Sequence, residues 1–548
     1  MGILRGTTES LRAFGAVFAN PSLRRLQLAG VGSTLGSWAY GVGLAVYAYH
    51  AGGARAVGIL YAARWGVAAI AAPWLGVLAD RGSRRAVMIA ADLARVAIMG
   101  AIAAIAFADG PYMPVFVLAV LSTTVTSVFI PAQSALMPSL VETPDELTAA
   151  NAVMNSVSSI GMFAGPAIGG IILAVSSPGT VFVLTAATFL WSALCLLGIA
   201  HDTPPEPSEH AGRLAELTAG FRAIAQTPAL RIVVGLTTAQ TFVAGALEVL
   251  IVVLALRLLH GGNGAVGWLN TGMGVGCLVG VIAVAALAGR KRLAGDFGIG
   301  VLLWGVPVAL AAVWTNLAFA VLLFAVIGIG NTLVDVAGMT LMQRSASEEI
   351  LGRVFGVFES LLLATMAIGA IVTPAVVSLL GPRGALVATG AFLPVLLVLT
   401  APALRRVDAA AHVPTEPLEL LRALPLFAPL PPTVLERLAS AVVEVHVPAM
   451  AEAVTQGATG DRFYVIRTGR ATVEVDGAET GELGPGEFFG EIALLRDVPR
   501  TATVRALDAL ELFALERDDF LAAVTGHAPS RAAADSIVAA RLPAGAAV

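Results

Sequence analysis

Apolar runs of about 20 residues recur through the first three quarters of the sequence, and they limit the possible folds more than any other feature. A helix needs roughly 20 apolar residues to cross the hydrocarbon core of a membrane. Because lipid cannot satisfy exposed backbone groups, and because the runs lack the alternation of barrel strands, they predict transmembrane helices. Hydrophobic residues make up 57% of the chain and charged residues only 13%, as in a membrane protein. Twelve runs are long enough: 26–49, 56–79, 86–108, 112–136, 150–174, 179–200, 229–257, 264–288, 296–316, 317–342, 354–378 and 383–404.

A polar connector at residues 201–228 separates the sixth run from the seventh. It divides the membrane part into two sets of six helices, residues 1–200 and 229–410. The connector itself predicts an amphipathic helix, because four apolar residues share one helical face. These residues are Leu214, Leu217, Phe221 and Ile224.

The two halves resemble one another in sequence. LMPSLVETPDELTAANAVMNSV, from Leu136, recurs in outline as LMQRSASEEILGRVFGVFESL, from Leu341. A Gly/Pro-containing apolar run, a short turn and another run follow each copy. Internal duplication of a six-helix unit is typical of transporters that bind substrate between two bundles.

Positive charge predicts the orientation of the helices. If twelve spans alternate in direction, the basic clusters fall on one side of the membrane, which is expected to be the cytoplasmic side. Both termini then lie in the cytoplasm, and the predicted location is the cell (inner or plasma) membrane. The clusters are 24–25, 80–85, 289–292 and 405–406.

Two motifs in the membrane part resemble a known family. GVLADRGSRR, residues 76–85, is similar to the signature loop between spans two and three of the major facilitator superfamily. GMFAGPAIGG, residues 161–170, resembles the glycine-proline motif in span five of that superfamily's antiporters. The resemblance covers about residues 20–405, and exporters of drugs, macrolides and siderophores look most alike. It implies a proton-coupled exporter of small or amphipathic molecules.

The same resemblance implies a set of gating residues. Asp80 and Arg81 would latch the cytoplasmic ends of the two bundles and release them on rearrangement. The glycines of the two motifs permit helices to approach closely, and Pro166 lets span five bend. The complete set is Gly76, Asp80, Arg81, Arg84, Arg85, Gly165, Pro166 and Gly169.

Charged residues inside the spans are costly in lipid, so they point to function unless they pair. Arg64 and Glu248 are expected to face each other across the bundle interface, as an outer gate or a proton-sensitive pair. Asp335 and Glu359 are each either a proton carrier or a charge at a helix end. Asp92 lies one turn from Arg95, which predicts a structural pair there or a contact with the Asp80 loop.

Residues 411–548 have a different character. They contain 19 Asp and Glu against 11 Lys and Arg, which argues against a nucleic-acid-binding module. After a short helical stretch, apolar and polar residues alternate from Val443 with Gly and Asp at turns, which predicts antiparallel strands in a small roll. The final stretch is again helical. The predicted fold is thus an α-helical membrane protein of two six-helix bundles with a C-terminal α+β domain containing a β-roll.

One short stretch of this tail predicts a binding site. FGEIALL, from Phe489, predicts a helix that begins at a glycine, whose free N–H groups suit an anion. Arg500, nine residues after Glu491, adds a charge-assisted contact to a phosphate. With GDRFYVIRTG at 460–469, the pattern resembles the cyclic nucleotide-binding domain of catabolite activator protein, protein kinase A regulatory subunits and cyclic nucleotide-gated channels, over about residues 416–541.

This second resemblance assigns roles to residues of the tail. It implies that Glu491 accepts a hydrogen bond from the ribose 2′-hydroxyl and that Arg500 binds the cyclic phosphate. The expected ligand is cAMP, but cGMP stays open because the Thr501 hydroxyl contacts a guanine amino group in relatives. The implied nucleotide site is Gly490, Glu491, Ile492, Ala493, Arg500 and Thr501.

Two features depart from that family's pattern. Met450 stands where the family usually has a glycine, so that turn is expected to differ. The closing helix offers small apolar side chains, such as Ile537 and Val538, and no aromatic to stack on the base. Modest affinity is therefore expected.

The combination predicts a transporter that is regulated by cAMP or cGMP through its cytosolic tail. We expect no enzyme activity and no cofactor besides this regulatory ligand, because no catalytic nucleophile, metal-ligand spacing or ATP-binding loop is recognised. The expected partners are a cyclic nucleotide, a small or lipid-like substrate and membrane lipid, and not nucleic acid. Two alternatives remain: a membrane receptor with little transport, and a lipid or lysophospholipid transporter with a structural tail.

Overall fold

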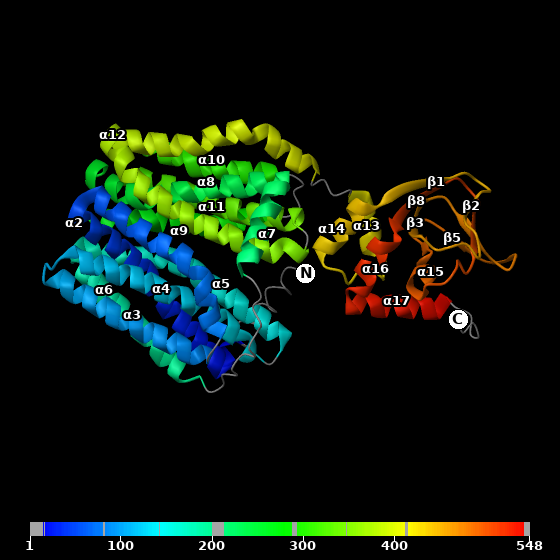
Figure 1. The fold of residues 1–548 in the computed structure, drawn as a ribbon, viewed down its shortest axis with the longest axis horizontal. Helices are drawn as coiled ribbons and strands as arrows, with labels where there is room; N and C mark the ends of the chain where they lie inside the picture. Colours follow the sequence, from blue (N-terminus) through cyan, green and yellow to red (C-terminus); the bar gives the residue numbers. More distant parts are fainter. Residues whose placement is uncertain are drawn as a thin grey trace. The chain divides into compact units, whose positions relative to one another are not determined.

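The computed structural model describes residues 15, 17–80, 83–141, 143–199, 213–287, 293–346, 348–410 and 415–541. The chain divides into two compact units, Met1–Ala410 and Ala411–Val548. The described part of the first unit is helical, whereas the second combines helices with two sheets (Figure 1).

The helices of the first unit lie side by side (Figure 1). Two of them are broken by kinks, α2 at Gly52 and Gly53 and α12 at Gly381. The elements are α2 (Pro21–Asp80), α3 (Arg84–Phe107), α4 (Tyr112–Leu136), η1 (Met137–Ser139), α5 (Pro144–Val175), α6 (Pro178–Leu197), α7 (Arg213–Gln226), α8 (Pro228–Val253), η2 (Leu254–Leu258), α9 (Gly264–Leu287), α10 (Leu293–Leu310), α11 (Leu317–Ser345) and α12 (Glu348–Ala410).

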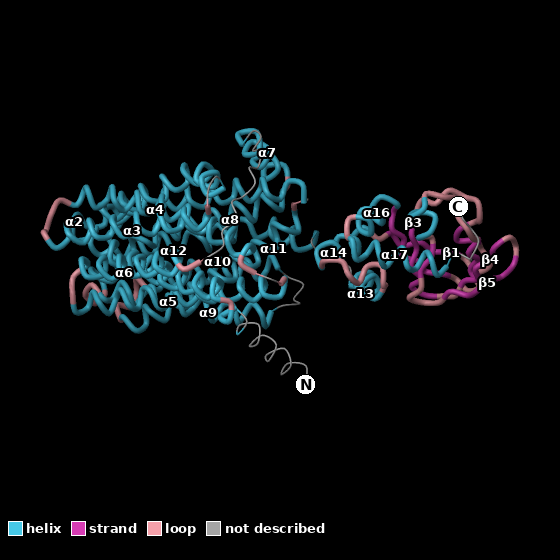
Figure 2. The backbone as a smooth tube through the Cα atoms, turned by 90° about the horizontal axis from the view of Figure 1, so that it is seen from below, coloured by secondary structure: helices cyan, strands magenta, loops and turns pink. Residues whose placement is uncertain are grey.

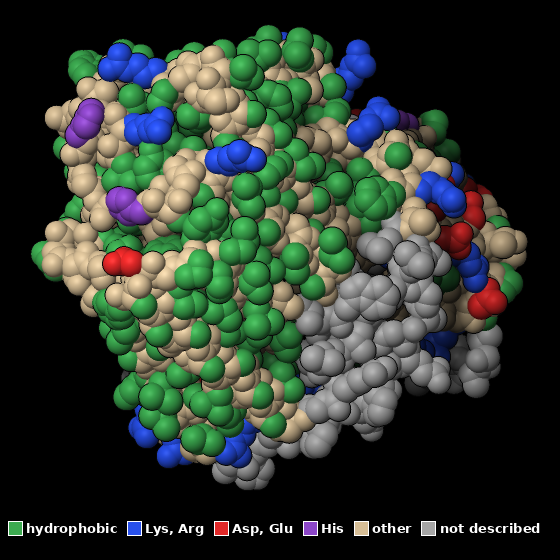
Figure 3. All heavy atoms as spheres, turned by 60° about the vertical axis from the view of Figure 1, so that its left-hand side comes forward, with side chains coloured by type: hydrophobic (Ala, Val, Ile, Leu, Met, Phe, Trp, Pro, Cys, Tyr) green, Lys and Arg blue, Asp and Glu red, His purple; other side chains and the backbone are tan. Residues whose placement is uncertain are grey.

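Ten helices in the described part of the chain are long and apolar enough to cross a membrane. Hydrophobic side chains are spread over the face of this unit that Figure 3 shows, as lipid contact requires. The prediction of an α-helical membrane unit is therefore confirmed. The first two predicted spans share the kinked α2 and the last two share α12. The count of twelve spans stays a prediction.

The two most extensive helix contacts between the halves, within the described residues, are equivalent under the predicted duplication. α5 packs against α9, and α2 packs against α12. In terms of the predicted spans, the first contact joins span five to span eight, and the second joins span two to span eleven. Small residues permit both approaches. A Cβ on Gly170 would lie 2.9 Å from the Cα of Gly267, and one on Gly58 would lie 2.5 Å from the Cγ of Pro374.

The predicted connector contains helix α7, which packs against α8 and α12. Ile224 of the predicted apolar face is buried, whereas Phe221 is exposed. The side chains of Leu214 and Leu217 lie outside the described residues.

The second unit contains the predicted β-roll. Two four-stranded antiparallel sheets have the orders β1-β8-β3-β6 and β2-β7-β4-β5. The strands are β1 (Val443–Val447), β2 (Glu452–Val454), β3 (Arg462–Thr468), β4 (Ala471–Val475), β5 (Ala478–Leu483), β6 (Phe488–Phe489), β7 (Thr503–Ala506) and β8 (Leu510–Glu516). The helices are α13 (Thr415–Ala423), α14 (Pro432–Ala441), α15 (Glu491–Arg496), α16 (Arg517–Thr525) and α17 (Ala528–Arg541).

Strand β3 shows why this sequence forms a roll. Phe463 and Val465 point to one face, where they pack with apolar residues of helices α13, α14, α16 and α17. Tyr464 and Ile466 point to the other face and form a core with the second sheet. The period of two thus supplies both cores from one strand. Figure 2 shows these four helices gathered beside the strands.

Candidate functional site

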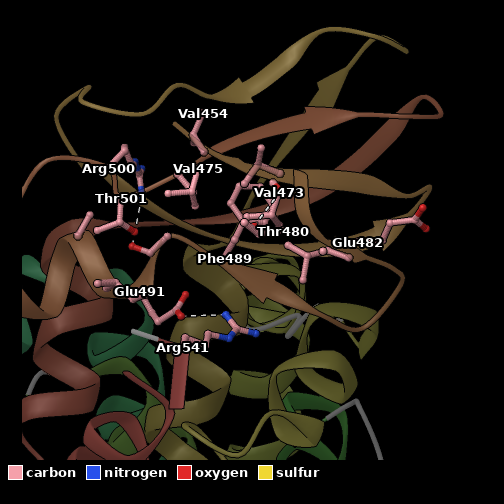
Figure 4. A pocket seen from close by; sticks show the side chains of 17 residues that line it. Val454, Val473, Val475, Thr480, Glu482, Phe489, Glu491, Arg500, Thr501 and Arg541 are labelled. Carbon is pink, nitrogen blue, oxygen red and sulfur yellow. Dashed lines mark hydrogen bonds and ion pairs between the residues drawn. The ribbon is translucent and has the colours of Figure 1, made fainter. Parts of the chain in front are cut away.

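A cavity of about 480 Å³ lies in the β-roll of the tail (Figure 4). Apolar residues of the second sheet form its walls, among them Val454, Val473 and Val504. Helix α15 and the loop after it close one side. All six residues of the predicted nucleotide site line this cavity: Gly490, Glu491, Ile492, Ala493, Arg500 and Thr501.

Arg500 is held in place by three acceptors. Its Nη1 donates to the carbonyl of Gly490 at 3.2 Å, and its Nη2 donates to the carbonyl of Arg462 at 2.8 Å. Nη2 also forms an ion pair with Asp461 at 3.1 Å. The Arg500 side chain is 3% exposed, whereas that of Asp461 is 69% exposed. These bonds use only part of the five-donor guanidinium, and the carboxylate partner faces solvent.

Tyr464 lies beneath this arginine. The centroid of its ring is 5.7 Å from the Cζ of Arg500. The ring also stacks on the ring of Phe489, with the two centroids 5.1 Å apart. Burial raises the pKa of the Tyr464 hydroxyl, and the nearby Asp461 carboxylate adds to this effect. The ring therefore faces the guanidinium in its neutral form.

Gly490 has both the conformation and the space that only glycine tolerates. Its φ of 93° and ψ of −5° are left-handed. A Cβ at this position would lie 2.6 Å from Nη1 of Arg500 and 2.9 Å from the carbonyl oxygen of Arg462. The glycine thus lets the chain turn into α15 directly against the buried arginine.

Glu491 is paired with a residue that the sequence analysis missed. Its carboxylate accepts a hydrogen bond from Nη1 of Arg541 at 2.8 Å. Arg541 also donates to the carbonyl of Phe488 and lies over the ring of that residue, with the Cζ 4.4 Å from the centroid. It lines the cavity from the last turn of α17 (Figure 4). The sequence offered one signal for this residue, because Arg541 is the basic residue in the last turn of α17.

The structure also corrects two expectations about the tail. Ile537 packs against the core that faces the helices and Val538 is fully buried, and neither is among the residues lining the cavity. Arg541 approaches the cavity from that helix instead. Met450 adopts a left-handed φ of 67°, so the turn keeps a glycine-like conformation without a glycine.

The predicted gating residues that the structure describes fall into three groups. Gly165 and Gly169 lie against α2, and a Cβ on Gly165 would be 2.4 Å from the Cβ of Trp38. Arg84 donates to the carbonyl of Ala135, and Arg85 to the carbonyls of Leu196 and Leu197, so these bonds join spans of the first half. Pro166 lines a cavity between the halves. Arg81 and the side chains of Gly76 and Asp80 lie outside the described residues.

The charged residues of the spans also separate into groups. Arg64 and Glu248 line one cavity of about 410 Å³. Asp335 accepts a hydrogen bond from Asn331 at 2.8 Å, and Glu359 is exposed; neither is among the residues lining that cavity.

The pair predicted within span three is present. Asp92 accepts a hydrogen bond from Arg95, and both side chains are fully buried. The Cζ of Arg95 lies 4.5 Å from the ring centroid of Phe129 and 4.2 Å from that of Phe189.

Different known proteins are similar to the two units of the chain. The chain is 26% identical over 310 residues to the uncharacterized MFS-type transporter YfiS of Bacillus subtilis, covering 53% of this chain and 70% of that protein. It is 41% identical over 102 residues to a cyclic nucleotide-gated potassium channel of Mesorhizobium japonicum, covering 19% of this chain and 28% of the channel. A cAMP-dependent protein kinase regulatory subunit of Yarrowia lipolytica is 37% identical over 103 residues, covering 18% of this chain and 27% of the subunit.

The chain therefore spans less than a third of the channel and of the kinase subunit. Among solved structures, the regulatory domain of Toxoplasma gondii PKA with cAMP aligns with 20% of this chain and 44% of its own, at 33% identity and a TM-score of 0.20.

Family models cover both units. A model of the Major Facilitator Superfamily matches residues 26–295 and 238–445, and a model of the cyclic nucleotide-binding domain matches residues 444–527. The first model spans well over half of the sequence. The chain belongs to the Major Facilitator Superfamily and carries a cyclic nucleotide-binding domain after its transporter domain.

Proposed function

We propose that the protein is a secondary transporter, a proton-coupled exporter of small or amphipathic molecules, and that cAMP binding to its cytosolic tail regulates the transport cycle. In this proposal the protein lies in the inner or plasma membrane of the cell, and both termini lie in the cytoplasm. Regulation requires that the nucleotide bind the tail more tightly in one transporter state than in the other. A coupling of roughly 1–3 kcal/mol is typical of such linkage.

The observation that carries the regulatory part is the environment of Arg500. Its guanidinium lines the cavity, is almost fully buried and is fixed by two backbone carbonyls. Its carboxylate partner, Asp461, is exposed. A cyclic phosphate would therefore meet a cation that is already oriented, and little side-chain entropy would be lost on binding. The Glu491 carboxylate would accept a hydrogen bond from the ribose 2′-hydroxyl, as in the domains that the tail resembles.

Calorimetry on the purified full-length protein tests the proposal. cAMP is expected to bind, with cGMP as the comparison because Thr501 also lines the cavity. Loss of Arg500 in Arg500→Ala should cost about 2–5 kcal/mol of binding free energy, a rise in Kd of about 30-fold or more. Arg470→Ala is the control, since Arg470 is an exposed arginine of the same domain paired with Asp508. No binding of either nucleotide would refute the regulatory part.

Transport is tested separately in proteoliposomes. Substrate counterflow separates a transporter from a receptor, which would show none. Collapse of the pH gradient should abolish concentrative export if Asp335 or Glu359 carries the coupled proton. The gating roles of Gly76, Asp80, Arg81, Arg84, Arg85, Gly165, Pro166 and Gly169 belong to this part of the proposal. Counterflow that is insensitive to internal cAMP would indicate a structural tail.

A further inference from the structure

The two halves of the transporter unit share the cavity of about 410 Å³. Helices α2 and α4 contribute to one side of it, and α8 and α9 contribute from the other half. Its lining is mainly apolar, with one polar strip on α4 formed by Ser122, Thr123, Thr126 and Ser127. A cavity of this size and lining suits a small molecule with an apolar body and a single polar end.

Arg64 is the cation of this cavity, and aromatic rings surround it. Its Cζ lies 5.5 Å from the ring centroid of Tyr40, 5.2 Å from that of Tyr61 and 5.7 Å from that of Trp65. Its Nε donates to Oγ1 of Thr123 at 2.9 Å. The rings stabilise the charge by cation–π attraction but accept few hydrogen bonds, so most guanidinium donors remain available.

An acid also lines this cavity, without a short ion pair to Arg64. Glu248 comes from α8 of the other half. Within the described part of the chain, no ion pair within 4.0 Å joins Arg64 to an acid. Tyr61 interacts with both charged groups. A ligand that carries negative charge can therefore reach Arg64 without displacing a bound carboxylate.

Two further donors beside Arg64 lack an acceptor. The Tyr40 hydroxyl and the Trp65 Nε1 are buried, and neither has a hydrogen-bond partner in the described residues. Both residues line the cavity and both face Arg64. Buried donors without acceptors are rare in proteins, and they mark a place where an acceptor-rich group fits. The guanidinium and the rings of Tyr40 and Trp65 thus gather in one part of the cavity lining.

We infer that this cavity binds an amphipathic organic anion, whose carboxylate, sulfonate or phosphate group pairs with Arg64 while its apolar body lies against the aromatic walls. This inference rests on the proposed transport function and names the substrate class. A charge-assisted bond to Arg64 is strong in such an environment because little water competes for it. A cationic ligand would instead have to bind near the Arg64 guanidinium.

Three probes of one skeleton test the assignment on the purified full-length protein. They are 1-naphthaleneacetate, 1-naphthaleneacetamide and 1-(2-aminoethyl)naphthalene, which differ mainly in charge. Equilibrium binding should favour the anion over the neutral amide by about 10-fold or more. Arg64→Gln should abolish this ratio, and Arg64→Lys should retain part of it. Arg55→Gln, which changes an exposed arginine of the same helix, should keep the ratio.

The ratio of affinities within one variant serves as an internal control for misfolding, because a change in the active fraction does not alter it. Equal binding of anion and amide, or no binding of any probe to folded protein, would overturn the inference. Preference for the ammonium probe, lost in Glu248→Gln, would also overturn it and assign the cavity to cations. None of these readouts uses cyclic nucleotide or transport, so failure of the proposed function is scored independently.

Discussion

The carboxylate of Glu491 accepts a hydrogen bond from Nη1 of Arg541 at 2.8 Å, although 50 positions separate the two residues. This ion pair joins the first residue of α15 to the last residue of α17. The Glu491 side chain is 2% exposed and that of Arg541 is 34% exposed. The terminal helix is thus attached to the group that the family resemblance assigns to the ribose.

Arg541→Ala should loosen the terminal helix. The substitution leaves the buried Glu491 carboxylate without this partner, at an expected cost of about 1–3 kcal/mol in domain stability. Hydrogen exchange of the full-length protein should therefore be faster in α17. Arg531→Ala, at an exposed position of the same helix, is the matched control and should leave exchange unchanged. Equal protection of α17 in both variants would show that the ion pair does not hold the helix.

Gly490→Ala should weaken nucleotide binding as well as stability. The new Cβ would lie 2.6 Å from Nη1 of Arg500 and must displace it. Gly477→Ala is the control, because Gly477 also has a positive φ, of 80°, but open space around its Cβ. Left-handed strain of about 1–2 kcal/mol should appear in both variants by denaturant unfolding. Only Gly490→Ala should raise the Kd for cAMP, and an equal Kd in both would contradict this account.

Met450→Gly should stabilise the tail. Met450 holds a φ of 67° in a turn and is 68% exposed, so its side chain contributes little packing to offset the strain. Relief of that strain exceeds the extra chain entropy of glycine, with a net gain of up to about 1 kcal/mol. Chemical unfolding monitored in the tail measures the gain. Met450→Ala relieves no strain, and a similar gain in that variant would assign the effect to loss of the exposed thioether.

Gly267→Val should destabilise the contact between the two halves of the transporter unit. A Cβ on Gly267 would lie 2.3 Å from the Cα of Gly170 and 2.7 Å from the carbonyl oxygen of Pro166. Overpacking at such a site costs about 1–3 kcal/mol. Thermal unfolding in detergent should show the loss for the membrane unit. Gly100→Val, at an exposed helical site with open space, is the control and should unfold like the original protein.

Arg467→Ala should separate nucleotide binding from regulation. Arg467 bonds both carboxylate oxygens of Glu416, at 2.6 and 2.7 Å, and so holds α13, the first described helix of the tail, against the roll. The pair is partly exposed and screened by solvent, so its loss should change the stability of the domain little. Nucleotide affinity should stay unchanged while the effect of cAMP on transport falls. An unchanged transport response would show that the signal does not pass through this contact.

Local sequence determined the elements of this protein. A membrane helix needs only an apolar run of sufficient length, and a strand between two cores needs only a period of two, as in Phe463 to Ile466. These patterns predicted the helical unit and the roll without any knowledge of distant contacts. The predicted nucleotide-site residues from Gly490 to Thr501 were recognisable for the same reason, because one short segment contains them all.

The tertiary structure decided the contacts between distant segments. Arg541 reaches Glu491 only because α17 folds back over the roll, and the Tyr40 ring meets Arg64 only because the two spans that share α2 pack together. No period or spacing encodes such pairs, since they depend on the angles at which whole elements dock. The left-handed turn at Met450 follows the same rule: the sequence disfavours that conformation locally, but the pairing of the surrounding strands fixes it. Sequence thus set what each segment becomes, and packing set which side chains share a site.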